Sequence, residues 1–506
     1  MLSSVKAVVA IDVGTSSARA GLVDEQLNVH HIASRAYGLE TPQPGYAEQS
    51  AEKIFAAVLE VIQACVAAAP AGVKIAGLAL DTAMHSFLAL DAAGRPLTPV
   101  WTWADMRAAR TANRLAEDGA AARALYRRTG CPVHAMYFPA KALWLKEHDP
   151  ETFDRAHTFT SIKGYLLMRL TGRLVDDLAI ASGYGLLDLE RLAWDPGALA
   201  VAGLTPERLP QLVEPAAIAG ELNAQLASRL GLEPLPVVAG GSDGPFANVG
   251  AGCVQEGDMT ITVGTSSAVR MFSGAPRVDG AMRTWCYYLG ERTWVVGGAI
   301  NGGASSLAWL QEAFGIAAGS GDAVHRELDR LAASVPPGAE GLIFAPYLAG
   351  ERNPGLRGEA RGYMAGIGLH HKARHFVRAT MEGIAFQIAW VYTRVAEVAG
   401  EPEKVRITGG FVGSSVWPQI LADVLGRPLE VPAEKEGSLV GTALFGLAAL
   451  VPGFDWRERA GAIRVERTLQ PDRASHERYR RFFEVYRDLY SAVQSQFSKI
   501  LSLQEL

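Results

Sequence analysis

The sequence has little of several features that mark other classes of protein. Of its 506 residues only four are cysteines, and no two of them form a C-x-x-C pair, so zinc sites and dithiol redox chemistry are not expected. The formal net charge is only -5, which gives no support for binding to nucleic acid or to an anionic membrane. No run of about 18 uncharged apolar residues occurs, so no membrane-spanning helix is expected.

Two further absences narrow the choice. Only five residues precede Lys6, where the first strand is expected, so we expect no signal peptide and place the chain in a reducing cytoplasm. The sequence also contains neither the G-x-G-x-x-G string of dinucleotide folds nor the G-x-x-x-x-G-K-[ST] string of P-loop proteins. Any nucleotide must therefore be held by other turns.

What is present indicates two large α/β domains, because the length is about twice what one hydrophobic core usually supports. Short apolar segments alternate with segments of helical spacing, which is typical of the α/β class. The boundary is expected in the glycine-rich stretch 240–257, giving domains at 1–250 and 251–506. The segments so predicted are strands at Val5–Val13, Ser16–Val23 and Ile75–Leu80, an extended stretch at Thr98–Trp103, and helices at Ser50–Ala69, Ala104–Ala116 and Ser475–Ile500.

The string Val-Gly-Thr-Ser-Ser occurs twice, at Val13–Ser17 and Val263–Ser267, each time between two predicted strands. Since the copies lie half a chain apart, they indicate an internal duplication. Such a turn can point N–H groups and hydroxyls at phosphate oxygens, and Asp12 beside the first copy can hold the Mg²⁺ that neutralises them. A plain hairpin turn is the alternative for either copy. The expected phosphate contacts are Gly14, Thr15, Ser16, Ser17, Gly264, Thr265 and Ser266.

Two glycine-rich strings also follow predicted strands. In Ile407–Gly413, bare backbone at Gly409 and Gly410 would let a base or ribose lie close, although a tight strand-to-helix turn is the alternative. In Gly240–Gly244, Asp243 could accept the proton of a sugar hydroxyl as it attacks the γ-phosphorus. Capping of the next helix is the alternative for Asp243.

Polar side chains gather in two strings that follow strands, Asp81–Ser86 and Trp101–Arg107. Ligands bind at strand ends in open α/β sheets, so His85, Asp105 and Arg107 are candidate sugar contacts. Trp103 could pack on the apolar face of a sugar. The alternative is a surface salt bridge between Asp105 and Arg107 beside a core tryptophan.

Taken together, these strings resemble the FGGY carbohydrate kinase family over nearly the whole chain. The most specific piece is Gly362–Ile367, followed after seven residues by His375–Glu382, which is similar to the family's C-terminal signature. The N-terminal signature is matched at Lys141 and Trp144–Leu145, whereas Phe138 stands where a proline or small polar residue is usual.

The resemblance implies two actin-like (ribonuclease H-like) domains with an interdomain cleft that holds ATP and a sugar. It implies Mg²⁺ at Asp12 and Asp243, and Asp243 as the catalytic base. The implied sugar contacts are His85, Trp103, Asp105, Arg107 and Asp243. The implied nucleotide contacts are the two phosphate turns together with Asn301, Gly302, Gly409 and Gly410.

Within the family, several strings look most like gluconokinases: Met84–Ser86, Trp103–Arg107, Ser242–Gly244 and Ala299–Gly303. The expected reaction is therefore transfer of phosphate from ATP to D-gluconate. Arg107 could bind the gluconate carboxylate bidentately, helped by Lys141 or protonated His85. A xylulokinase or other pentulose or polyol kinase is the alternative within the family, and an actin- or chaperone-like ATPase switch is the alternative outside it. A homodimer is left open.

Overall fold

The computed structural model describes residues 5–316, 319 and 321–504. Contacts divide the chain into two compact units, and each is described by itself. Unit 1 consists of Met1–Val254, Phe272–Val295 and Glu436–Ile463, and unit 2 of Gln255–Met271, Val296–Lys435 and Arg464–Leu506. Among the described residues, no helix has the length and apolar character needed to cross a membrane.

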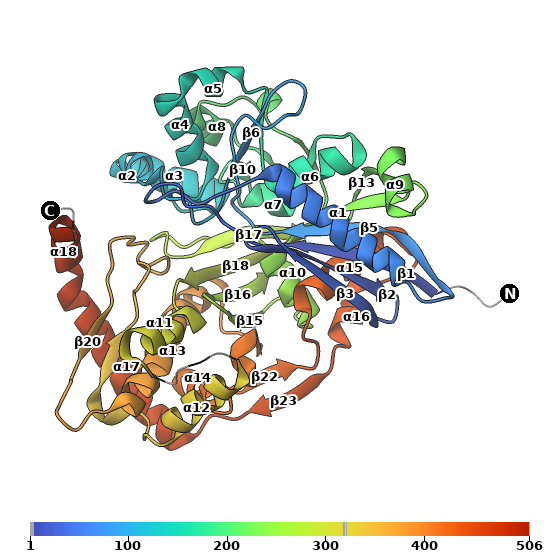
Figure 1. Ribbon diagram of the computed structural model, residues 1–506. Coiled ribbons are helices and arrows are strands. Elements are labelled where there is room, and N and C mark those ends of the chain that lie inside the picture. Colours follow the sequence, from blue (N-terminus) through green and yellow to red (C-terminus); the bar gives the residue numbers. More distant parts are fainter. Residues whose placement is uncertain (1–4, 317–318, 320, 505–506) are drawn as a thin grey trace. The chain divides into compact units, whose positions relative to one another are not determined.

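Unit 1 is built on a mixed sheet with the strand order β13-β14-β5-β1-β2-β3 (Figure 1). Its strands are β1 (Val5–Val13), β2 (Ser17–Asp24), β3 (Val29–Ala36), β5 (Val73–Thr82), β13 (Ile218–Glu221) and β14 (Pro236–Ser242). The first three strands form an antiparallel meander, and β1, β5 and β14 run parallel to one another. The predicted strands and hairpin at the N-terminus are confirmed.

Alternate residues of β1 face opposite sides of this sheet, as the period of a strand requires. Ala7, Val9 and Ile11 belong to the cluster that contains α1 (Ala51–Ala67). Val8 and Ala10 instead pack with residues of α15 (Gly437–Leu450). Asp12 has the same parity as Val8 and Ala10, so its side chain is directed to the α15 side. A third helix, α10 (Asp243–Gly250), packs closely on α15, where a Cβ at Gly441 would lie 2.1 Å from the Phe246 carbonyl oxygen.

Helix α1 begins as the sequence predicts, because the Ser50 hydroxyl accepts a hydrogen bond from the Lys53 amide at 3.3 Å. The helix expected at Ala104–Ala116 begins later, as α2 (Ala109–Glu117). The Asp105 carboxylate accepts the Arg107 amide at 3.2 Å, and this side-chain bond holds the preceding residues in a turn. The extended stretch before it is reduced to β7 (Val100–Trp101).

The rest of unit 1 consists of short strands and helices. They are β4 (Glu48–Gln49), β6 (Leu88–Leu90), α3 (Gly119–Thr129), α4 (Phe138–His148), α5 (Pro150–Arg155), β8 (Thr158–Thr160), α6 (Ile162–Thr171), β9 (Val175–Asp177), α7 (Leu178–Ser182), β10 (Leu187–Asp188), β11 (Ala193–Trp194), α8 (Pro196–Ala202), β12 (Gln211–Val213), α9 (Ala224–Leu230), β17 (Trp285–Gly290) and α16 (Trp456–Gly461). Phe138, which departs from the family signature, stacks on Tyr184 with ring centroids 3.7 Å apart. Its unusual side chain therefore belongs to an aromatic core.

Six consecutive strands of a seven-stranded sheet, in the order β18-β16-β15-β21-β22-β23, repeat in unit 2 the strand order of the unit 1 sheet. Its strands are β15 (Asp258–Val263), β16 (Ser267–Ser273), β18 (Thr293–Ile300), β21 (Lys404–Thr408), β22 (Leu429–Pro432) and β23 (Val465–Leu469). The strand β15 is antiparallel to β16 and parallel to β21, as β1 is to β2 and β5. This confirms the duplication that the repeated string predicts.

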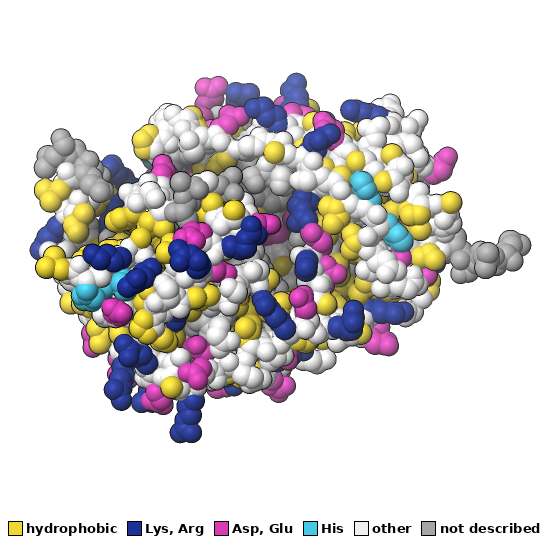
Figure 2. Space-filling model, turned by 60° about the horizontal axis from the view of Figure 1, so that its bottom comes forward, with side chains coloured by type: hydrophobic (Ala, Val, Ile, Leu, Met, Phe, Trp, Pro, Cys, Tyr) yellow, Lys and Arg dark blue, Asp and Glu magenta, His cyan; other side chains and the backbone are white. Residues whose placement is uncertain are grey.

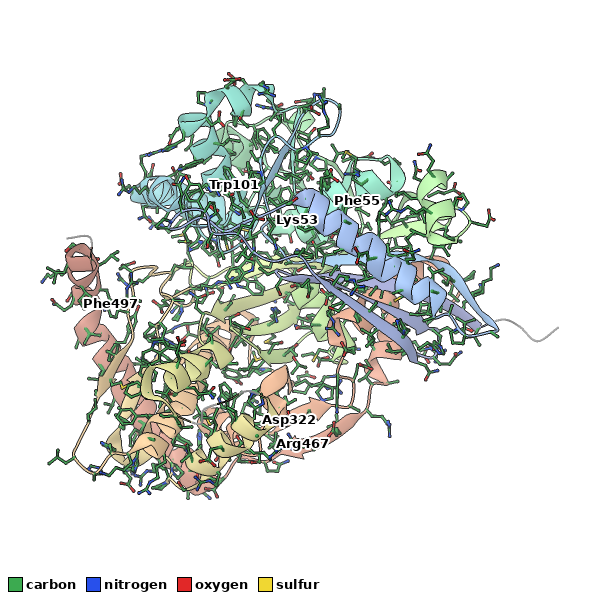
Figure 3. The ribbon with its side chains drawn as sticks, viewed as in Figure 1. Lys53, Phe55, Trp101, Asp322, Arg467 and Phe497 are labelled. Carbon is green, nitrogen blue, oxygen red and sulfur yellow. The ribbon has the colours of Figure 1, made fainter. Side chains whose placement is uncertain are left out.

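The C-terminal tail, predicted as a helix at Ser475–Ile500, packs on the body of unit 2. The tail is divided into α17 (Arg473–Val493) and α18 (Phe497–Gln504), and Phe497 is labelled in Figure 3. Tyr479, Tyr486 and Tyr490 are buried, and their rings contact Phe386 and Trp390. The other elements of unit 2 are α11 (Ala304–Phe314), α12 (Asp322–Ala333), β19 (Ile343–Ala345), β20 (Tyr363–Ala365), α13 (Ala373–Ala399) and α14 (Trp417–Leu425).

Candidate active site

Three aspartates stand at the carboxyl ends of the three parallel strands of unit 1. Asp12 near the end of β1 lies opposite Asp81 on β5. Gly241 on β14 also lies opposite Asp81, and Asp243 follows two residues later. The sheet therefore concentrates negative charge at one edge, where α/β sheets bind ligands. Asp243 and Asp12 are brought together as the sequence predicts, with Asp81 between them.

The middle carboxylate is the most buried of the three. Burial raises the pKa of Asp81 well above its usual range, and the charges of Asp12 and Asp243 raise it further, against a hydrogen bond from Thr442. The Asp12 Oδ2 atom accepts a hydrogen bond from the Ser438 hydroxyl at 2.6 Å. Both hydroxyls come from α15, the helix on the side of the sheet to which Asp12 is directed. The sequence could have identified Asp81 as a site residue, because it stands at the end of a strand, as Asp12 does.

Asp243 is the first residue of α10, and Ser242 before it occupies the N-cap position. The Asp243 Oδ1 atom accepts a hydrogen bond from the Gly244 amide at 2.6 Å. The side chain is half-buried. The carboxylate thus lies at a helix N-terminus, where the helix dipole favours its charged form.

The first of the two predicted phosphate turns, Val13–Ser17, is held through its carbonyl oxygens. The Gly14 amide donates to the Ser17 carbonyl at 3.0 Å, which closes the turn. The Tyr37 hydroxyl donates to the carbonyls of Gly14 and Ser17, and the side-chain amide of Gln49 donates to the Thr15 carbonyl. Burial raises the pKa of Tyr37, and the charges of Asp12 and Asp243 raise it further. Neither Tyr37 nor Gln49 stands in a motif that the sequence made visible.

Trp103 connects the string Trp101–Arg107 to that turn. Its indole Nε1 atom donates to the Thr15 hydroxyl at 2.9 Å. The ring is half-buried.

The Arg107 side chain is only 5% exposed, so its salt bridge with Asp105 does not lie on the surface. Its Nε and Nη2 atoms donate to Asp105 at 2.9 and 2.8 Å, and Nη2 also bonds Glu48. The guanidinium carbon lies 3.8 Å from the Tyr46 ring centroid and 4.0 Å from that of Trp101, which Figure 3 labels. The bidentate fork is therefore occupied by Asp105. This corrects the expectation that the same fork receives a substrate carboxylate.

Lys141 is also committed to the protein. It is fully buried and donates to the carbonyls of His85 and Thr102 at 2.7 and 2.9 Å. Burial lowers the pKa of Lys141 to about 7, the Asp105 charge opposes that shift, and the Arg107 charge adds to it. Lys141 therefore connects the loops that contain His85 and Thr102. This corrects the expectation that it binds a sugar acid.

His85 has a left-handed backbone, with φ of 67°. Its Nε2 atom lies 3.0 Å from the Tyr287 hydroxyl, which is itself 2.7 Å from the Tyr137 hydroxyl. The strained backbone and the hydroxyl pair fix the orientation of the imidazole. Tyr287 belongs to the segment Phe272–Val295 of unit 1, far from His85 in the chain, and no sequence motif predicted this contact.

In unit 2 the second turn is held by the start of α11. The Gly264 amide donates to the Ser266 carbonyl at 2.9 Å. The carbonyls of Gly264 and Thr265 accept bonds from the Ala304 amide at 2.8 Å and the Ser305 hydroxyl at 2.7 Å. The contact is close, since a Cβ at Gly303 would lie 2.5 Å from the Gly264 oxygen.

The other predicted nucleotide residues lie around this turn. Asn301 donates to the Ala349 carbonyl at 2.7 Å, and the Gly302 carbonyl accepts from Ser267 at 2.8 Å. Gly409 has φ of 98°, and a Cβ there would lie 2.3 Å from the Val263 oxygen. Gly410 has nothing within 4 Å of the corresponding Cβ position. Bare backbone is thus available beside the second turn.

A divalent cation would find oxygen ligands at the acidic edge. Mg²⁺ takes hard oxygen donors, and it usually binds one or two carboxylates together with water and phosphate. The Asp12 and Asp243 carboxylates fit that requirement. Among the described residues, no cluster of three or more His, Cys, Asp or Glu could enclose a metal by itself.

Comparison with known proteins identifies the family. The profile of the FGGY family of carbohydrate kinases matches with its N-terminal domain at residues 7–250 and its C-terminal domain at 259–450. The chain belongs to this family. It is 34% identical over 506 residues to a gluconokinase of Bacillus licheniformis, and the match covers 98% of both chains. It is 29% identical over 493 residues to a xylulose kinase of Lactococcus lactis, covering 96% of both chains.

Solved structures of two Lactobacillus acidophilus proteins agree with this assignment. A gluconate kinase superposes with a TM-score of 0.93 at 28% identity, over 98% of this chain and 100% of that one. A ligand-bound xylulose kinase superposes with a TM-score of 0.92 at the same identity and coverage. The protein is therefore a carbohydrate kinase with the actin-like, ribonuclease H-like α/β fold.

Proposed function

We propose that this FGGY kinase transfers the γ-phosphate of ATP to D-gluconate, giving 6-phosphogluconate and ADP. The observation that carries the proposal is the graded similarity along the full chain. Two Bacillus gluconokinases are 34% and 33% identical to it, whereas the xylulose kinases of Lactococcus lactis and Escherichia coli are 29% and 28% identical.

Asp243 is the proposed catalytic base. It stands at the end of β14, beside the carboxylates of Asp12 and Asp81. In this role it orients the attacking primary hydroxyl and accepts its proton. Positioning of this kind can supply up to about 7–11 kcal/mol of the barrier reduction.

Asp12 and Asp243 are the proposed ligands of Mg²⁺, which when bound supplies positive charge to the transferred phosphate. Asp12 is held for this by Ser438. In unit 1 the proposed phosphate contacts are Gly14, Thr15, Ser16 and Ser17. In unit 2 the proposed nucleotide contacts are Gly264, Thr265, Ser266, Asn301, Gly302, Gly409 and Gly410.

The proposed sugar contacts are His85, Trp103, Asp105, Arg107 and Asp243. The Nε and Nη2 atoms of Arg107 bind Asp105. The atom proposed to contact the carboxylate of a sugar acid is therefore Nη1, which forms no hydrogen bond among the described residues. The main effect of Arg107 is then to hold Asp105 and Glu48 in place. If Arg107 acts mainly by holding Asp105 and Glu48, Arg107→Lys should weaken the binding of neutral and acidic sugars alike. A bidentate pair between Arg107 and the sugar carboxylate would instead make the loss larger for acidic sugars.

A sugar panel tests the proposal. ADP release would be measured with D-gluconate, D-xylulose, glycerol and no sugar, and the product would be identified by mass spectrometry and phosphorus NMR. We expect kcat/KM for D-gluconate to exceed the others by at least about tenfold, since one well-placed interaction is worth that much. A preference for xylulose would select the pentulose-kinase alternative.

The alternative outside the family's chemistry is an actin- or chaperone-like ATPase switch. It predicts ATP turnover that no sugar stimulates. The no-sugar reaction in the same panel measures this directly, and sugar-independent turnover as fast as the best sugar reaction would contradict the proposed kinase function.

A further inference from the structure

The strand that carries the proposed base is interrupted just before it. On β14, Val238 lies opposite Ala79 of β5, but Gly241 lies opposite Asp81, so two residues of β14 face Leu80 alone. This is a β-bulge, which bends a strand and re-aims the residues that follow. Gly240 within it has φ of 72°, and a Cβ there would lie 1.7 Å from the Leu80 oxygen. The bulge therefore requires glycine.

A buried lysine bridges this bulge. Lys163 of α6 has no exposed side-chain surface. Its Nζ atom donates to the Leu80 carbonyl at 2.9 Å and the Gly241 carbonyl at 2.7 Å, which are the carbonyls on either side of the interruption. The third contact is the Asp177 carboxylate at 2.9 Å. The ammonium thus donates two hydrogen bonds to main-chain carbonyls and forms an ion pair with Asp177.

The position of these oxygens gives the lysine its consequence. Gly241 precedes Asp243 by two residues, and Leu80 directly precedes Asp81. A bulge leaves backbone groups without their ladder partners, and an ammonium is a costly way to fill such a gap unless its charge is paired. The Asp177 carboxylate provides that pairing.

We propose that Lys163 is a positioning residue for phosphoryl transfer, fixing the bulge of β14 so that Asp243 is aimed at the acceptor hydroxyl. The inference rests on the proposed role of Asp243 as the base. Lys163 touches neither substrate nor phosphate in this scheme, and acts only through the backbone of Leu80 and Gly241.

Lys141 provides a matched comparison. It too is fully buried and donates to main-chain carbonyls, but these belong to His85 and Thr102 on the sugar-side loops. Loss of either ammonium should lower stability. The kinetic effects should separate, because Lys163 lies behind the base and Lys141 behind the sugar contacts.

The experiment measures kcat and both KM values for the full chain carrying Lys163→Met or Lys141→Met, with the best sugar of the panel. Rates are corrected for the folded fraction from thermal unfolding. We expect Lys163→Met to lower kcat by about 100-fold, the loss that a displacement of about 1 Å can cause, with both KM values within about threefold. Lys141→Met should mainly raise the KM for sugar, by about tenfold.

A Lys163→Met kcat within about threefold of wild type, or a loss that falls mainly on KM, would overturn the proposal. If the methionine variant does not fold, Lys163→Arg, which keeps the charge but changes the donor geometry, carries the test. A reduced kcat with KM retained supports positioning, and an unchanged kcat contradicts it. Asp243→Asn separates the two levels: if it stays active, the base role fails. If it is inactive while both Lys163 variants keep wild-type kcat, only the role of Lys163 fails.

Discussion

The two copies of Val-Gly-Thr-Ser-Ser make different turns from the same five residues. In unit 1, Val13 pairs with Ala18, so residues 14–17 form the loop. In unit 2, Val263 pairs with Ser267, and residues 264–266 form it. The supports differ as well, since Tyr37 and Gln49 hold the first loop and the start of α11 holds the second. An identical string thus takes its final shape from the contacts around it.

The larger difference is electrostatic. At equivalent positions in the two sheets, Asp12 faces Asp81 in unit 1, whereas Thr262 faces Thr408 in unit 2. The two threonine hydroxyls lie 3.0 Å apart and bond to each other. The two units therefore share a strand order but differ in the side chains at the strand ends. An acidic edge suits metal-assisted phosphoryl transfer. The second edge has no such pair of carboxylates, its Thr262 hydroxyl accepts a hydrogen bond from Arg270 at 3.4 Å, and its bare glycine backbone suits a nucleotide.

The largest effect is expected at the acidic edge, from Asp243→Asn. Removing a general base should lower kcat by about 10²–10⁴-fold while ATP still binds, because the neutral amide keeps the size of the side chain but cannot accept the proton. Turnover and ATP binding by calorimetry would be measured on the same preparation. Near-normal kcat would remove Asp243 from the role of base.

A paired substitution then compares the two edges directly. Asp12→Asn should lower kcat by about 10²-fold or more and raise the Mg²⁺ concentration needed for half-maximal rate, since phosphoryl transfer depends on charge neutralisation. Thr262→Val at the equivalent position removes no charge, and it should change kcat by less than about threefold. Titration of Mg²⁺ at saturating ATP measures both. Equal losses in the two variants would mean that the edges are not chemically distinct.

The sequence predicted the scaffold of this comparison well. Strand β1 and helix α1 begin and end close to their expected limits because their apolar spacing and the Ser50 cap are local signals. The duplicated string pointed to a repeated sheet, and the family resemblance is confirmed. Asp12 and Asp243 lie at the ends of the two strands that flank β5, because parallel strands present their carboxyl ends at one edge.

The partners of charged side chains were not predictable in the same way. Arg107 and Lys141 were expected to face a sugar acid, but the first binds Asp105 and the second binds main-chain carbonyls. Tyr37 and Tyr287 belong to no motif, and their contacts join residues far apart in the chain. Spacing reports which face of an element is buried, but it does not report which polar group meets which across the fold.

An intermediate effect is expected at the edge of the unit 2 sheet, from Gly409→Ala. The added Cβ would lie 2.3 Å from the Val263 oxygen at a φ of 98°, so the end of β21 must shift beside the second turn. We expect the KM for ATP to rise by about tenfold with a smaller change in kcat. Gly413→Ala is the control, because nothing lies within 4 Å of its Cβ position. If both variants gave the same KM for ATP, the second turn would not depend on this close approach.

The smallest effect concerns the pH dependence of stability. It compares the buried Lys141 of unit 1, which can carry a charge, with the uncharged Thr262 of unit 2. Burial lowers the pKa of Lys141 to about 7 from a usual value of 10.5. Between these values the unfolded chain holds a proton that the folded chain has released, so stability must rise with pH, by at most about 1.4 kcal/mol per pH unit. Below pH 7 both states are charged and this contribution is constant.

Urea unfolding of wild type and Lys141→Met from pH 6 to 9 should therefore give a stability difference that is flat in acid and grows in favour of wild type above about pH 7. Thr262→Val, which removes no titrating group, should leave its own difference flat throughout. A flat difference for Lys141→Met as well would show that the buried ammonium does not lose its proton in this range, and that the charge beneath the sugar-side loops is permanent.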